Sequence, residues 1–147
     1  MPGDYSQYVA RPTKKDSDSV TFGFLLCALT DEAKIVSVKP AESIGNGFSV
    51  ESTRLATFRA ADGITIASPG SPPAGRAGER FSPIAGSSPH SCNDKDQLSE
   101  VQIGIRKTGD DGGGWRRAIV EYEVSDRQYS LEIPFGMLIC GASTEPC

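Results

Sequence analysis

The sequence predicts an all-β protein folded as an antiparallel β-sandwich of about seven strands. Apolar and polar residues alternate along several segments, which is the period of a strand with one buried face. Turn signals rich in Gly, Pro, Asp and Ser separate these segments, and no segment has the period of about 3.6 residues that marks an amphipathic helix. A chain of 147 residues is long enough for one domain with its own hydrophobic core.

The alternation and the turn signals together define the predicted strands. They are residues 20–28, 34–39, 48–60, 64–67, 101–107, 115–124 and 129–140. We expect the apolar faces of residues 101–105, 118–124 and 129–137 to share one core. Pro40 is expected to end the second strand, and Pro134 predicts an edge position or a bulge in the last one, because proline has no N–H to donate to a ladder.

The chain is predicted to have three parts. Residues 1–19 are polar and rich in charged and turn-forming side chains, and we interpret them as a flexible leader or tether. Residues 20–141 are expected to form the β-sandwich domain, with a break in the third strand near Ser52. Residues 142–147 are left as a short C-terminal tail.

A long segment rich in Pro, Gly and Ser interrupts the strands at residues 69–97. Its prolines cannot donate to a ladder and its small side chains bury little surface, so we expect it to be the least ordered part of the domain. Phe81, Ile84 and Cys92 are expected to hold it against one end or edge of the sandwich. Loops of this length are often functional, which makes it the candidate recognition loop. Its candidate contact residues are Arg76, Arg80, Phe81, Ile84 and His90.

The four cysteines, Cys27, Cys92, Cys140 and Cys147, have no spacing typical of a metal site, and we interpret them as disulfide-forming residues. Cys27 and Cys140 each end an apolar strand, within the similar runs FGFLLCA and GMLICGA. If the first and last strands lie side by side in parallel, these two sulfurs meet, so we predict a Cys27–Cys140 disulfide. Cys92 then pairs with Cys147 or keeps a free thiol. The alternative is a cytosolic protein with four reduced cysteines.

The order of these features resembles an immunoglobulin-like or fibronectin-III-like sandwich, and is similar to uncharacterised extracytoplasmic domains of high-GC Gram-positive bacteria. The resemblance rests on FGFLLCALTDEAKIVSVKPAESIGNGFSVE and RAIVEYEVSDRQYSLEIPFGMLICG, and it covers residues 20–141. The cysteine pair that brackets a core tryptophan in antibody domains is not reproduced, since the sole tryptophan, Trp115, adjoins a glycine turn. The resemblance implies an architecture and an extracytoplasmic location, and it implies no activity.

Composition argues against nucleic acid as a partner and against a membrane span in this chain. The net charge is −4 and there is no basic stripe, so an electrostatic footprint for nucleic acid is missing. Arg116 and Arg117, with Arg106 and Lys107 on the preceding segment, are interpreted as a solvated hairpin face. No stretch reaches the roughly 18–20 apolar residues of a membrane span. The polar start has no signal peptide, and we expect Met1 to stand where an export signal has been removed.

Two patterns resemble metal sites but have simpler explanations. His90, Cys92 and Asp94 form a His-x-Cys-x-Asp run, but no second histidine exists in the chain to complete a zinc set. His90 and Cys92 also lie on a Pro/Ser-rich segment, with no rigid element to orient them as a catalytic pair. Residues 110–112 resemble part of a calcium loop, but the remaining ligands are absent and a hairpin turn explains them. We therefore predict no metal, no cofactor and no catalytic residue.

The sequence favours a non-catalytic extracytoplasmic binding or structural module, secreted or anchored at the cell surface. Its expected partner is an unknown protein or a cell-envelope ligand. One alternative is a small hydrolase with carboxylate chemistry, in which Glu121, Glu123 and Glu132 meet in a cleft. Alternating acids usually form the solvated face of a sheet, which argues against it. The other alternative is a cytosolic partner-binding domain with free thiols.

Overall fold

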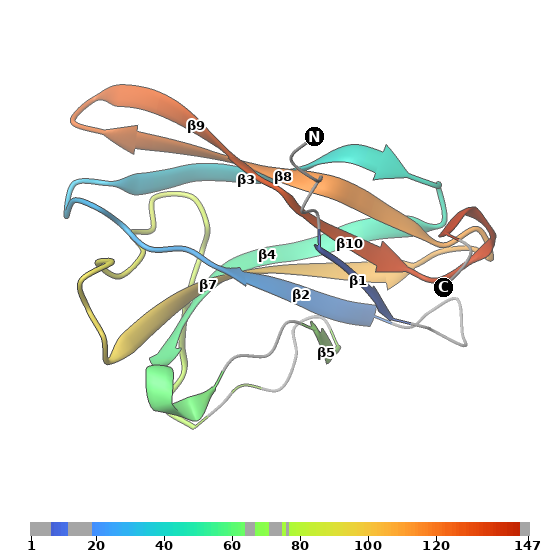
Figure 1. Cartoon of the computed structure of the whole chain (residues 1–147), viewed down its shortest axis with the longest axis horizontal. Helices are drawn as coiled ribbons and strands as arrows, with labels where there is room; N and C mark the ends of the chain where they lie inside the picture. The colour runs from blue at the N-terminus through green and yellow to red at the C-terminus, as the bar shows by residue number, and fades with distance from the viewer. Residues whose placement is uncertain (1–6, 12–18, 64–66, 71–74, 76, 145–147) are drawn as a thin grey trace.

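Two β-sheets face each other in the computed structural model, which describes residues 7–11, 19–63, 67–70, 75 and 77–144 (Figure 1). The strands are β1 (Gln7–Arg11), β2 (Ser19–Leu25), β3 (Lys34–Ile44), β4 (Phe48–Arg59), β5 (Ala67–Pro69), β6 (Arg80–Ser82), β7 (Gln97–Lys107), β8 (Gly113–Val124), β9 (Arg127–Ile133) and β10 (Phe135–Ile139). The described helices are two single 3-10 turns, η1 (Ala60–Asp62) and η2 (Ala142–Thr144). The predicted all-β sandwich is confirmed.

Each sheet is built around a long strand with partners on both sides, β8 in one sheet and β7 in the other. The β8 sheet has the strand order β1-β10-β8-β3, with β9 also paired to β8, and the β7 sheet has the order β5-β2-β7-β4-β6. In Figure 1 the β8 sheet lies above the β7 sheet. Neighbouring strands run antiparallel except β1, which lies parallel to β10. The immunoglobulin-like topology remains a prediction.

The core between the sheets follows the predicted alternation. Val101, Ile103 and Ile105 of β7 are fully buried, and Phe22 of β2 lies beside Ile103 in the ladder. Trp115 of β8 is also fully buried, and its ring meets the Phe22 ring edge-on with 6.4 Å between centroids. Burying side chains of this size contributes about 1.5–3 kcal/mol each, so this layer is the main source of stability.

The start of β8 approaches β10 unusually closely. A Cβ atom on Gly114 would lie 1.8 Å from the carbonyl oxygen of Met137, so only glycine fits without breaking the pairing of the two strands. The run of glycines after residue 111 was predicted as a turn. Gly113 and Gly114 instead begin the strand, and the close approach explains why they must be small.

The last predicted strand is in fact two strands separated by Pro134. Both pair with the same edge of β8, β10 with residues 113–115 and β9 with residues 118–124. The expected irregularity at Pro134 is therefore present. The predicted core is only partly correct here, because Tyr129 and Leu131 are 42% and 40% exposed. These side chains lie on the correct face of β9, but the β7 sheet does not cover that end of the strand.

Other boundaries also differ from the prediction. Pro40 does not end the second strand, because β3 is at the edge of its sheet and tolerates a missing N–H there. The third strand is continuous, and a register shift between Val50 and Ser52 places a bulge at the predicted break. The predicted leader includes residues 7–11, which form β1 beside β10. The predicted strand at residues 64–67 lies largely outside the described residues.

The segment predicted as a long loop, residues 69–97, is built into the fold. Its β6 pairs with β4 at the edge of the β7 sheet. Ile84 is only 6% exposed and belongs to the main core, so it is a core residue and more than a loop anchor. The backbone at residues 86–87 exchanges two hydrogen bonds of 2.8 Å with Ile35 of β3. The described part of this segment therefore closes one end of the sandwich.

Truncating Ile84 to Ala should lower the free energy of unfolding by about 2–5 kcal/mol, because buried methyl groups are lost and a cavity remains. Denaturant titration followed by Trp115 fluorescence measures this change. Leu29→Ala is the matched control, since Leu29 is 90% exposed and its truncation should cost less than about 0.5 kcal/mol. Equal effects of the two substitutions would show that Ile84 is not a core residue.

Candidate functional site

An apolar hollow of about 320 Å³ lies at one end of the sandwich, where the two sheets separate. In Figure 1 the β8–β9 hairpin rises away from the β7 sheet at this end, with the connection between β2 and β3 below it. We call this hollow the hairpin groove. Its lining includes Leu26, Leu29, Tyr122, Val124, Tyr129 and Leu131.

The β8–β9 hairpin supplies one wall of the groove. Its turn consists of Ser125 and Asp126, both with positive φ (48° and 66°), which is the two-residue turn that matches the twist of paired strands. This turn sets the register, so Tyr122 faces Tyr129 across the ladder and their rings stack with 5.3 Å between centroids. Leu131 follows Tyr129 on the same face. The alternation therefore presents a continuous apolar face to the groove.

The opposite wall is the chain that follows β2, and a Cys27–Cys92 disulfide holds it in place. The Ala28 N–H donates to the His90 carbonyl oxygen (2.8 Å), and the Cys92 N–H donates to the Ala28 carbonyl oxygen (2.9 Å). Pro89, next to His90, lines the groove. A covalent bond and two backbone hydrogen bonds therefore hold this wall in place within the chain itself.

The predicted Cys27–Cys140 disulfide is wrong. Cys27 follows β2 in the β7 sheet, whereas Cys140 follows β10 in the β8 sheet, so their strands are not neighbours. Cys92 is bonded to Cys27, and thus is neither free nor paired with Cys147. Cys140 is also disulfide-bonded, and its partner lies outside the described residues. None of the described cysteines is a free thiol, which contradicts the alternative of four reduced cysteines.

His90 and Asp94 lie beside a smaller hollow of about 180 Å³ next to the disulfide. The backbone N–H groups of Asp96 and Gln97 donate to Asp94 Oδ1 (2.9 and 3.1 Å), and these bonds lower the pKa of Asp94 more than its neighbour His90 does. His90 Nδ1 is 3.6 Å from Asp94 Oδ2. The Cys92 sulfur is oxidised and cannot act as a thiolate ligand. The described residues contain no cluster of three His, Cys, Asp or Glu side chains suited to a metal ion.

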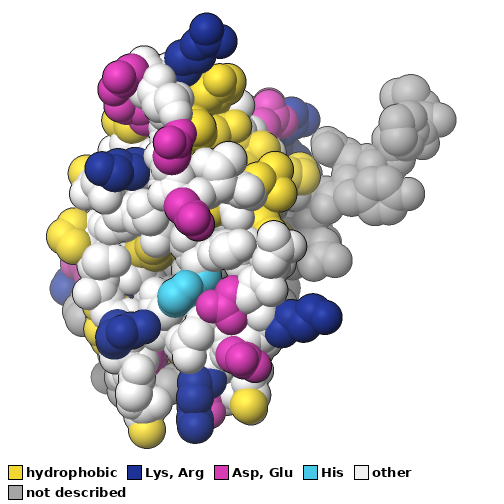
Figure 2. Space-filling view, turned by 90° about the vertical axis from the view of Figure 1, so that its left-hand side faces the viewer, with side chains coloured by type: hydrophobic (Ala, Val, Ile, Leu, Met, Phe, Trp, Pro, Cys, Tyr) yellow, Lys and Arg dark blue, Asp and Glu magenta, His cyan; other side chains and the backbone are white. Residues whose placement is uncertain are grey.

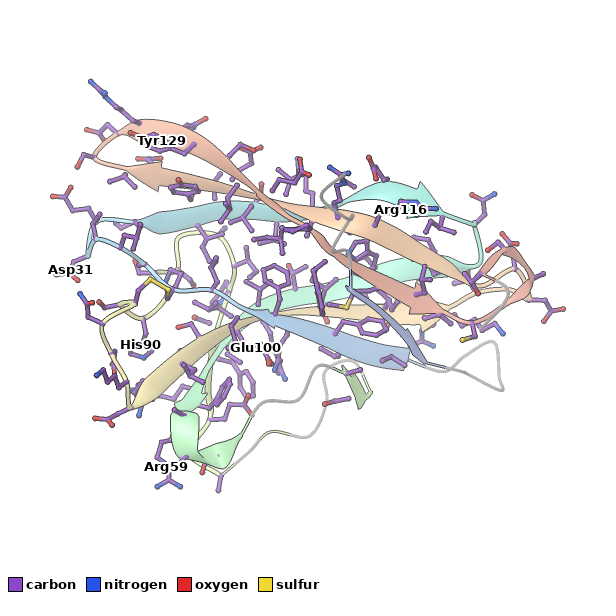
Figure 3. The ribbon with its side chains drawn as sticks, in the orientation of Figure 1. Asp31, Arg59, His90, Glu100, Arg116 and Tyr129 are labelled. Atoms are coloured by element: carbon purple, nitrogen blue, oxygen red, sulfur yellow. A yellow bond between two sulfur atoms is a disulfide. The ribbon has the colours of Figure 1, made fainter. Side chains whose placement is uncertain are left out.

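The candidate contact residues of the recognition loop do not form one surface. Arg80 and Phe81 lie on β6 at the edge of the β7 sheet. Ile84 is in the core, and His90 lies below the groove wall, well away from the hairpin that carries Tyr129 (Figure 3). Arg76 lies outside the described residues.

The acidic side chains proposed for hydrolase chemistry point away from the groove. Glu121 and Glu123 alternate with the groove-lining residues of β8 and so occupy its outer face. Glu132 forms an ion pair with Arg117 on that outer face. The buried carboxylate of Glu100 lies on the outer face of the β7 sheet, where Gln102 Nε2 donates to it (2.8 Å). None of these three acids lines the hairpin groove or the smaller hollow next to the disulfide.

Sequence reasoning assigned the groove residues to other roles. Tyr122, Tyr129 and Leu131 match a core pattern, because alternation marks a face of a strand and does not reveal what covers that face. Leu29 directly follows the predicted strand at residues 20–28 and carries no pattern that marks it as a binding residue. The signal that could have separated them from the core is Pro134, which detaches β9 from β10, so that β8 is the one described strand that pairs with β9.

Comparison with known proteins found no matching family model, no matching curated protein and no matching solved structure. Neither of the described helices has the length or apolar character needed to cross a membrane.

Replacing Cys27 and Cys92 together by Ser should lower the free energy of unfolding by about 4 kcal/mol, since the bond joins residues separated by 65 positions and restricts the unfolded chain. Denaturant unfolding measures the loss, and Ser88→Ala in the same segment is the control with little effect. Non-reducing peptide mapping of the wild-type protein should yield a linked Cys27–Cys92 peptide. A linked Cys27–Cys140 peptide would contradict this arrangement.

Proposed function

We propose that the chain is a non-catalytic binding module that works outside the cytoplasm and takes an apolar group of its partner into the hairpin groove. The observation that carries this proposal is a preformed hollow whose large apolar side chains remain accessible to solvent. Leu29 is 90% exposed, and Tyr129 and Leu131 are each exposed by two fifths. Apolar side chains that cluster in this way at a protein surface are typical of interaction sites.

The size of the groove limits what it can hold. A volume of about 320 Å³ is near the lower end of the range of about 300–1,000 Å³ found for ligand sites. It suits a small ring system or one or two apolar side chains of a protein or cell-envelope component. Seen from this end, apolar side chains gather above the single histidine (Figure 2). The hydroxyl groups of Tyr122 and Tyr129 add hydrogen-bonding capacity at its wall.

The groove has the chemistry of a binding site more than that of an active site. Its described lining contains no carboxylate, imidazole or free thiol, the groups that most often act as acids, bases or nucleophiles, and Lys34 is its one charged residue. The Cys27–Cys92 disulfide supports an extracytoplasmic location, because disulfides persist mainly in oxidising compartments. A role for Arg80 and Phe81 in recognition stays a prediction, on a separate surface.

The neutral fluorescent probe N-phenyl-naphthylamine tests the groove directly. Its emission should rise on binding to the wild-type protein. Ala33→Trp, which fills the groove from its wall, and Leu29→Asp, which places a charge at its mouth, should each raise Kd at least about tenfold, or about 1.4 kcal/mol.

Val50→Asp is the matched control for these variants. Val50 is 43% exposed on β4 and lies outside the described lining, so the new charge should leave Kd unchanged. A wild-type protein that does not bind the probe, or an Ala33→Trp variant that binds it as well as the wild type, would refute the groove as a binding site.

A further inference from the structure

We infer that β9 is a self-association edge, along which the β9 strands of two copies of this chain pair antiparallel around Ser130. The inference does not require a ligand in the groove, because the backbone of β9 makes the hydrogen bonds of the pair. Within the described residues β9 pairs only with β8, so one edge of the strand has no neighbour.

The hairpin turn determines which backbone groups face that edge. Val124 and Arg127 flank a two-residue turn and form a hydrogen-bonded pair, and such pairs recur at every second residue along an antiparallel ladder. The odd-numbered residues of β9 therefore direct their N–H and C=O groups toward β8. Gln128, Ser130 and Glu132 direct theirs toward the open edge, where each can donate and accept one hydrogen bond.

The other strand edges carry features that hinder pairing with another chain. β5 and β6 have three residues each, and β1 has five. β3 contains Pro40 and a register shift between Ile35 and Ser37, and a register shift between Val50 and Ser52 interrupts β4. β9 has seven residues, no proline and no register shift against β8. Natural sheets usually blunt such an edge, so a long regular one indicates a pairing partner.

The sequence of β9 is complementary to itself. Pairing centred on Ser130 places Tyr129 opposite Leu131 of the second copy, at a non-hydrogen-bonded position where side chains approach most closely. It also places Gln128 opposite Glu132 of the second copy, which joins an amide donor to a carboxylate. A register centred on Glu132 would instead set two carboxylates against each other. Pairing centred on Ser130 also places each residue of β9 that directs its backbone groups toward the open edge in a hydrogen-bonded pair.

This pairing has consequences for the whole molecule. A two-fold axis at Ser130 joins two β8 sheets into one continuous sheet and leaves both hairpin grooves on the same side of it. Tyr129 and Leu131, which are partly exposed in one copy, gain an apolar neighbour across the axis. A single strand pair is a small interface, so the dimer should form in a concentration-dependent equilibrium.

Amide hydrogen exchange measured by NMR on the full chain tests the pairing at residue level. In dilute solution the amides of Gln128, Ser130 and Glu132 should exchange quickly, while the odd-numbered residues of β9 are protected by β8. Raising the concentration to about 1 mM should slow exchange at these three amides, and sedimentation should show a dimer. Rapid exchange and a monomer at every concentration would refute the inference. Protection at all concentrations would mean that the edge is covered within one molecule, which also refutes it.

Ser130→Pro removes an outward N–H that the β8–β9 ladder does not use, and should raise the dimer dissociation constant at least about tenfold. Ser130→Thr keeps this N–H and is the matched control.

The substitution Gln128→Lys provides a second test if the proline variant folds poorly. Position 128 lies opposite Glu132 of the second copy, so a positive charge there should tighten the dimer about threefold. Leu29→Asp should impair probe binding without affecting dimerisation, so the two proposals fail separately. A dimer unchanged by both Ser130→Pro and Gln128→Lys would contradict pairing along β9.

Discussion

Strand β8 shares one of its edges between two successive partners, and this constraint shapes the rest of the structure. Pro134 prevents β9 and β10 from forming one continuous strand, so β10 pairs with the start of β8 and β9 with its remainder. At the start of β8, Gly114 allows β10 to approach closely. The next residue, Trp115, is fully buried in the core. The glycine-rich start of β8 is thereby held between β10 and β3 within its sheet, and the other half of β8 forms a hairpin with β9.

The hairpin groove exists because the two sheets diverge at this end and a rigid segment fills only part of the space. The Cys27–Cys92 disulfide and the hydrogen bonds between Ala28 and its neighbours hold that segment below the hairpin. Without such restraints, apolar walls would be expected to close on each other, since each square ångström of apolar surface removed from water contributes about 25 cal/mol. The same bond that restricts the unfolded chain also fixes one wall of the groove that Tyr129 and Leu131 line.

Two different properties of one hairpin support the two proposals. Side chains on the inner face of β8 and β9 form the apolar wall of the groove, whereas the backbone of β9 forms the open edge. Tyr129 and Leu131 belong to both, because they line the groove and flank the axis of the inferred pair. Ligand binding and self-association would consequently be linked, and a ligand that contacts these residues in both copies would favour the dimer.

The sequence by itself determined the fold class, most strand positions and the buried face of β7, because these depend on local alternation and turn chemistry. Val101, Ile103 and Ile105 are buried as their pattern requires. The disulfide partner of Cys27, the core position of Ile84 and the exposure of Tyr129 were decided only by the tertiary structure. Each depends on which strands are neighbours and on what covers a given face, and these are contacts between residues far apart in the chain. The alternation of apolar and polar residues along a strand carries no information about these contacts. A strand therefore has the same sequence pattern whether its apolar face meets a second sheet or an open groove.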